Sequence, residues 1–174
     1  VLVLLLAQSV LSKTIKAQAP LVSIGNISEL KGNAQVYRDK AYGAELAFPI
    51  QQLDNVKTEA GRVAIRFEDD TVVRVMDHSK LVINSYIYDP NPKKSEMALR
   101  FASGTARFVT GKFNNKKAIR IQTPSADVFV RGTDFTITTT PETGASLVIL
   151  LPDEYGNSSG EISVETAAGQ VVLN

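Results

Sequence analysis

The sequence predicts an all-β protein, an antiparallel β-sandwich or barrel-like stack of about a dozen short strands, with an apolar leader helix at the N-terminus. Three observations predict it. Apolar and polar residues alternate along most of the chain, turn-forming residues interrupt the alternation at short intervals, and no heptad or long helical pattern follows the leader. Because successive side chains of a strand point to opposite faces of a sheet, this alternation buries one face.

Residues 62–88 carry the clearest alternation. Two breaks, the acidic turn Glu68-Asp69-Asp70 and the pair Asp77-His78, divide it into three runs. We therefore expect three consecutive strands of a meander that buries one shared face. The apolar residues assigned to that face are Val63, Ile65, Phe67, Val73, Val75, Leu81, Ile83 and Ile87.

Residues 21–38 are expected to form two short strands around the turn Lys31-Gly32-Asn33, where glycine tolerates positive φ. Residues 39–55 are less regular, and Pro49 argues against a central strand there. A polar loop at 89–96 leads into 97–113, which we interpret as two strands with a hairpin bend at Gly104.

The C-terminal part continues the pattern of strands and turns. Asn114-Asn115-Lys116 and Pro124-Ser125 form turns on either side of a strand, and a Thr-rich strand follows at 134–140. Pro141-Glu142-Thr143-Gly144 then makes a hairpin turn. The last hairpin is centred on Ala168-Gly169.

Residues 1–19 resemble a secretory signal peptide, because they open on the apolar run VLVLLLAQSVLS. Two small-x-small sequences, Ala17-Gln18-Ala19 and Ala7-Gln8-Ser9, are possible cleavage points. The run is shorter than the roughly 20 residues of a spanning helix, although a membrane anchor stays an alternative. We expect a single β domain at 20–174, exported to the periplasm or the cell exterior, with membrane contact only through an uncleaved leader.

Composition argues against several classes of function. The formal charge is +1, which is a poor basis for nucleic-acid binding. The chain has no cysteine, which excludes disulfides, thiolate zinc sites and cysteine nucleophiles, and its only histidine, His78, lies in a predicted turn. The acidic pairs Asp69-Asp70 and Asp153-Glu154 lack the spacing of a calcium loop. We expect no enzyme activity, cofactor or metal.

Charge is distributed unevenly along the second half. From Asp134 onward there are six acids and no lysine or arginine. Two interpretations stay open: oppositely charged strands that attract across one sheet, or a basic binding strip. Between positions 100 and 131 the only acid is Asp127, against the basic residues Arg100, Arg107, Lys112, Lys116, Lys117, Arg120 and Arg131.

Residues 53–137 resemble the FecR domain family. The similarity is carried by LDNVKTEAGRVAIRFEDDTVVRV, SKLVINSYIYD, ALRFASGTARFVTG and, most specifically, IRIQTPSADVFVRGTDFTI. Asp70 departs from the glycine that many members have, and Val128-Phe129-Val130 is bulkier than usual. The resemblance implies an all-β domain that acts by binding in the periplasm or outside the cell. Because a signal-like leader precedes it, we expect a stand-alone exported module without the sigma-factor-binding part.

Two groups of residues are candidate sites. In Arg131-Gly132-Thr133-Asp134-Phe135, we expect a bend at Gly132 and a charge-assisted hydrogen bond between Arg131 and Asp134, as a structural clasp or a ligand site. Tyr86 and Tyr88 share one predicted strand face and could pack across strands or bind a sugar or a protein. The possible binding surface comprises Tyr86, Tyr88, Arg107, Lys112, Lys116, Lys117 and Arg120.

The function we expect is protein–protein recognition through a sheet edge or the basic strip, in envelope sensing and signalling or in extracellular assembly. The source would be bacterial or phage-like, and the partner an unidentified protein or a second copy. One alternative is a scaffold protein of a surface layer or virion-like particle. Another is a carbohydrate-binding module that uses Tyr86 and Tyr88.

Overall fold

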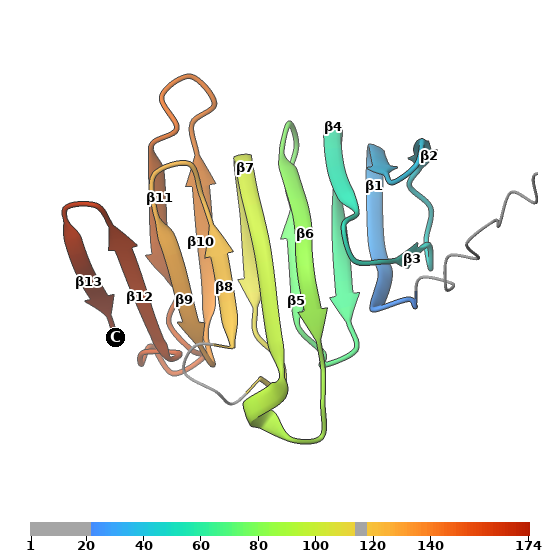
Figure 1. Cartoon of the computed structure of the whole chain (residues 1–174). Coiled ribbons are helices and arrows are strands. Elements are labelled where there is room, and N and C mark those ends of the chain that lie inside the picture. The colour runs from blue at the N-terminus through green and yellow to red at the C-terminus, as the bar shows by residue number, and fades with distance from the viewer. Residues whose placement is uncertain (1–21, 114–117) are drawn as a thin grey trace, which may run out of the picture.

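A computed structural model describes residues 22–113 and 118–174, so the expected leader helix and the turn at 114–116 lie outside the described residues. The described part is almost entirely β-structure (Figure 1). Within it, no helix combines the length and apolar character needed to cross a membrane. The elements are β1 (Gly25–Tyr37), β2 (Ala41–Gly43), β3 (Pro49–Ile50), β4 (Asn55–Phe67), β5 (Val72–Val75), β6 (Lys80–Ile87), η1 (Pro92–Lys94), β7 (Glu96–Val109), β8 (Ile119–Gln122), β9 (Asp127–Arg131), β10 (Asp134–Thr139), β11 (Ser146–Leu150), β12 (Glu161–Thr166) and β13 (Gly169–Leu173).

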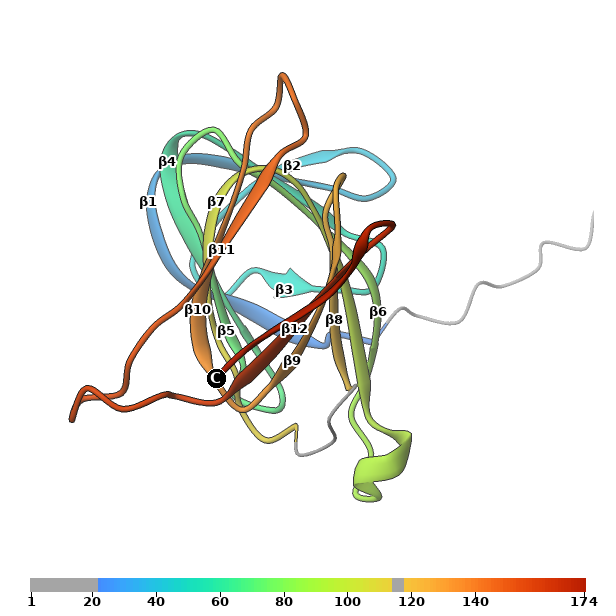
Figure 2. The same ribbon diagram turned by 90° about the vertical axis from the view of Figure 1, so that its left-hand side faces the viewer.

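The strands form two layers that face each other across the core, and Figure 2 shows them as the two sides of a flattened ring. Three long strands, β1, β4 and β7, contribute one half to each layer. Layer A contains β11, β10, the C-terminal halves of β7 and β4, β5 and the N-terminal half of β1. Layer B contains β13, β12, β9, β8, the N-terminal halves of β7 and β4, β6 and the C-terminal half of β1.

Glycines allow the long strands to bend from one layer into the other. Gly32 of β1 and Gly61 of β4 lie opposite each other at one bend, and Gly104 of β7 has φ of 92°. A Cβ at Gly104 would collide with the side chain of Ser79. The predictions of two strands around Gly32 and of a hairpin at Gly104 are therefore wrong. Gly32 and Gly104 each bend a continuous strand, because positive φ changes the strand's direction without reversing it.

The strand pairing corrects two further expectations. β4 and β5 pair antiparallel as predicted, but β6 pairs with β4 and β7 in layer B instead of continuing the meander beside β5. The bend of β4 makes this possible, because its N-terminal half already lies in layer B. The sheet is antiparallel except at β7–β8, where Met97 lies opposite Ile119 in a parallel pair.

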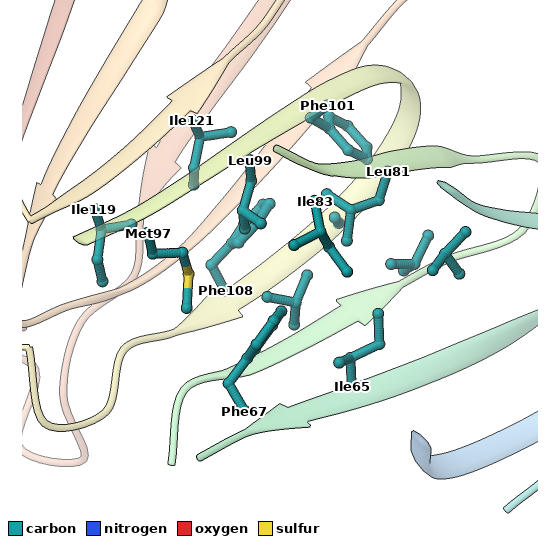
Figure 3. Packing of buried hydrophobic residues seen from close by; sticks show 14 of the residues in the cluster. Ile65, Phe67, Leu81, Ile83, Met97, Leu99, Phe101, Phe108, Ile119 and Ile121 are labelled. Carbon is teal, nitrogen blue, oxygen red and sulfur yellow. The ribbon is translucent and has the colours of Figure 1, made fainter. Parts of the chain in front are cut away.

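The core fills the space between the layers, and Figure 3 shows ten of its labelled side chains pointing into it from β4, β6, β7 and β8. Aromatic rings contribute much of the packing, with Phe108 stacked on Phe135 at a centroid distance of 5.0 Å. Seven of the eight apolar residues predicted for the buried face of 62–88 are buried, and Ile87 is exposed. A register shift between Ile83 and Ser85 explains this, because the extra residue Asn84 reverses the side-chain alternation.

Residues 38–54 close one end of the sandwich. The short strands β2 and β3 pair with the C-terminal and N-terminal halves of β1 and so cover the edges of both layers. Ile50 is fully buried there, and Phe48 packs against the core. Arg38 donates to both carboxylate oxygens of the buried Asp54, at 2.7 and 2.8 Å. We call this region the capped end.

Candidate recognition surface

The described basic residues of the predicted binding surface are paired with acids. Arg107 binds Asp134 of the neighbouring strand at 2.5 Å, Arg120 binds Asp127 at 2.8 Å, and Lys112 binds Asp70 at 2.6 Å. The hydrogen bond from Lys112 lowers the pKa of Asp70, and the bonds to Asp134 and Asp127 raise the pKa values of the two arginines. The two arginines therefore join neighbouring strands, whereas Lys112 joins the segment after β7 to the β4–β5 turn. Lys116 and Lys117 lie outside the described residues.

The string Arg131–Phe135 carries the chain from layer B to layer A. Arg131 ends β9 and binds Glu161 of β12 at 3.2 Å, whereas Asp134 begins β10 and binds Arg107. The predicted hydrogen bond between Arg131 and Asp134 is therefore wrong: the two residues lie in different layers and each pairs with its own neighbouring strand. Gly132 provides the expected bend, with φ of 51°.

Side chains on either side of Gly132 fix this crossing. The amide of Thr133 donates to Thr110 Oγ1 at 2.7 Å, and the Thr133 hydroxyl bonds that of Ser159 at 2.8 Å. Phe135 is fully buried against Phe108. The string therefore has a role in the architecture, because it anchors the connection between the layers.

Tyr86 and Tyr88 do not form an exposed pair. Tyr86 is only 3% exposed; its ring stacks on Phe67 at 5.4 Å, and its hydroxyl donates to Asp69 Oδ1 at 3.1 Å. Tyr88 is exposed beside Phe113. The prediction of an exposed tyrosine pair is thus wrong, although both rings lie 5.9 Å from the ring of Phe113. The extra residue in β6 turns Tyr86 into the core, and Tyr88 lies beyond the end of that strand.

The adjacent acids have different surroundings. Asp69 is buried, which raises the pKa of its carboxyl, while hydrogen bonds from Thr71 and Tyr86 oppose that rise. Asp70 is exposed. Asp153 accepts hydrogen bonds from the amides of two residues of its own loop, which lower its pKa. Among the described residues, no cluster of three or more His, Asp or Glu side chains is placed to hold a metal ion.

The end of the sandwich opposite the capped end is open. Beyond β7, layer A continues with two described strands, β10 and β11, and layer B with four, β8, β9, β12 and β13. Figure 1 shows the β12–β13 hairpin extending past β11. Among the described strands, β11 and β13 each have one unpaired edge. We call this region the open end; its exposed apolar residues are Leu147, Ile149, Val171 and Val172.

A groove of about 540 Å³ lies between β11 and β13. One wall is formed by Val148 and Leu150 of β11, and the other by Val172 and Leu173 of β13, with residues 151–158 between them. Of the inward-facing side chains at this end, Val148, Leu150 and Leu173 are half-buried and Val171 is exposed, because layer A stops before it covers β13. The sequence analysis missed this groove. Its signals were the unbroken apolar run at 147–151, which gives β11 an apolar outer face, and the acid-only charge after position 134.

Comparison with known proteins identifies the family. The model of the FecR protein family matches residues 54–172, which run from the end of the capped segment through β13. The chain belongs to the FecR family. The match extends beyond the resemblance found in the sequence and includes the groove at the open end.

The fold of this FecR protein is similar to two crystal structures, at 2.50 and 1.65 Å resolution, of a candidate anti-sigma factor from Parabacteroides distasonis. The TM-scores are 0.53 and 0.51, and the sequence identity is 16% in both cases. The alignments cover 68% of this chain and 50% of the other, so the chain matches about half the length of these neighbours. No curated protein matches the chain.

Proposed function

We propose that this FecR protein is an exported, non-enzymatic domain that recognises another protein in envelope sensing or signalling. Its family and its likeness to the fold of a candidate anti-sigma factor support a role in signalling. The signal-like residues 1–19 support a place in the periplasm or outside the cell, with residues 20–174 as the working domain.

The open end is the observation that carries the proposal. Unpaired strand edges present N–H and C=O groups that can bind an incoming strand, and soluble proteins usually protect such edges. Here the two edges flank a groove and carry the exposed apolar residues Leu147, Ile149, Val171 and Val172. A grouped apolar surface beside free edges favours protein recognition.

A scaffold built by continuous strand pairing is disfavoured by the capped end. An open-ended assembly needs two complementary interfaces on each copy. β2 and β3 cover the edges of β1 but pair with no further described strand, so the capped end offers edges of only three and two residues for sheet continuation. Strand pairing between copies is therefore weaker at the capped end than at the open end, which disfavours a continuous filament.

A photo-crosslinking residue tests the proposed function. We would place it at Leu147 of the open end or at Leu46 of the capped end, since both side chains are exposed, at 59% and 65%. In the native envelope, the Leu147 position should give one defined crosslinked protein that the Leu46 position does not give. Identical products from both positions, or none from Leu147, would contradict the proposal.

A further inference from the structure

We propose that the groove at the open end is completed by an extended segment of a partner protein, which pairs as a new strand with β11 and alternates apolar residues with lysine or arginine. This inference rests on the proposed function and specifies the occupant of the same site. It follows from three features: the free backbone groups of β11, the uncovered wall of β13 and the charge of this end.

The backbone of β11 is oriented for another strand. Antiparallel pairs alternate between hydrogen-bonded and non-bonded positions. On either side of the β10–β11 pairing, the amide of Thr140 bonds the carbonyl of Ala145 and the amide of Leu151 bonds that of Asp134. Because hydrogen-bonded and non-bonded positions alternate along β11 between these two bonds, every second residue of β11 points its N–H and C=O groups toward the free edge. These residues are Ser146, Val148 and Leu150.

The side chains of β13 show what such a strand would cover. Val171 lies opposite Val164, and Leu173 opposite the fully buried Ile162, so Val171 and Leu173 face the inside of the sandwich. Yet Val171 is 61% exposed. A strand added to β11 would extend layer A across from β13 and bury Val171. Apolar side chains are needed on the inner face of that strand, at every second residue.

The charge of the open end determines which residues the partner segment should carry between its apolar ones. Positions 135–174 contain five acids and no lysine or arginine, and one of the five, Glu161, is paired with Arg131 of β9. Asp153 and Glu154 belong to the loop whose residues 151, 152 and 156–158 line the groove. A basic segment is attracted to this end, and an acidic one is repelled.

Pairing with β11 is favoured over two other arrangements. A strand added to β13 would lengthen layer B further and leave Val171 uncovered. A second copy paired through β11 would bring together two regions that carry acids and no bases. A separate basic segment avoids both problems.

Binding of synthetic strands to the 174-residue chain tests the inference. The probe is a peptide of about six residues, a usual strand length, that alternates valine and lysine. Its control alternates valine and glutamate. We expect the lysine peptide to bind saturably and to slow amide exchange at Ser146, Val148 and Leu150. The glutamate peptide should bind at least about tenfold more weakly.

Three variants locate the site. Val148→Pro removes an edge amide that β10 does not use and should weaken binding about tenfold or more. Val171→Lys adds a like charge to the facing wall and should weaken it similarly. Leu46→Lys, at a similarly exposed apolar position of the capped end, is the matched control and should have no effect on binding. If Val148→Pro does not fold, the comparison of Val171→Lys with Leu46→Lys still decides, because both of these changes alter exposed side chains.

The remaining outcomes overturn the inference. These are no binding of the lysine peptide, equal binding of both peptides, equal effects of Val171→Lys and Leu46→Lys, or a peptide that only dissociates a dimer seen in sedimentation. If the peptides fail while the Leu147 crosslink still gives a defined partner, the proposed function stands and only the strand-pairing mode is wrong. If both fail, the proposed function is wrong as well.

Discussion

At the capped end, residues 38–54 fold back over the edges of both layers, whereas at the open end β11 and β13 keep their outer edges unpaired. The covering segment is irregular and contains Pro49, and its short strands end almost as soon as they begin. The open end is built from regular hairpins. An irregular segment can cross from one layer to the other and hydrogen-bond to the edges of both. Regular hairpins extend each layer separately and leave its outer edge unpaired.

The two ends also differ in their relation to the family. The matched residues, 54–172, begin where the capped segment finishes and include β11, β12 and most of β13. The free edges of β11 and β13 therefore lie within the shared family domain. The cap belongs to the part of this chain that precedes the match.

The largest expected difference concerns buried apolar contacts. Ile50→Ala removes a fully buried side chain from the capped end and should lower the free energy of unfolding by about 3 kcal/mol. Ile149→Ala, at an exposed position of the open end, should lower it by about 0.5 kcal/mol. Chemical denaturation measures both. Equal losses would show that the two ends are packed alike.

A smaller effect is expected from the ion pair of the capped end. Arg38→Met leaves the buried Asp54 without its charged partner and should cost about 2 kcal/mol, since Arg38 is itself partly exposed. The control is Arg107→Met, which breaks the more exposed pair with Asp134 and should cost less than about 1 kcal/mol. Thermal and urea unfolding of the two variants would be compared. A larger loss in the control would contradict this ranking.

Hydrogen exchange should separate the two ends in the unmodified protein. The β12–β13 hairpin has one open edge and an exposed inner face, so we expect its paired amides to exchange about 100-fold faster than those of β1 and β4. Uniform protection along the sheet would mean that the open end unfolds only with the whole molecule.

The smallest effect on stability should come from a surface charge. Leu147→Lys and Leu46→Lys each alter an exposed leucine and should change the free energy of unfolding by about 0.5 kcal/mol or less. Only Leu147→Lys should reduce weak association at high protein concentration, because its neighbours at the open end are also apolar. Light scattering of the two variants tests this. A similar reduction by Leu46→Lys would remove the distinction.

Side-chain alternation predicted the class of fold and most of the core, because burial of one face determines which residues are apolar. It failed where one residue changed the alternation: the bulge at Asn84 exchanged the positions predicted for Tyr86 and Ile87. It also took the bends at Gly32 and Gly104 for turns, since local sequence does not distinguish a strand that bends from one that reverses.

The candidate surface was harder to predict than the core. The charge pattern correctly suggested strands of opposite sign, as the pair Arg107–Asp134 shows, but partners within a sheet follow from topology. Likewise, Val171 has the sequence pattern of a buried residue, and only the unequal lengths of the two layers leave it exposed.

The central position of β7 in the sheet determines when the two parts of the sheet can join during synthesis. In the described sheet, strands β8 to β13 connect to the earlier strands only through β7, which pairs with β5, β6, β8 and β10. A nascent chain emerges N-terminus first, so β5 and β6 present bare apolar surface until residue 109 has left the ribosome. Chaperone protection during synthesis is needed most in that interval.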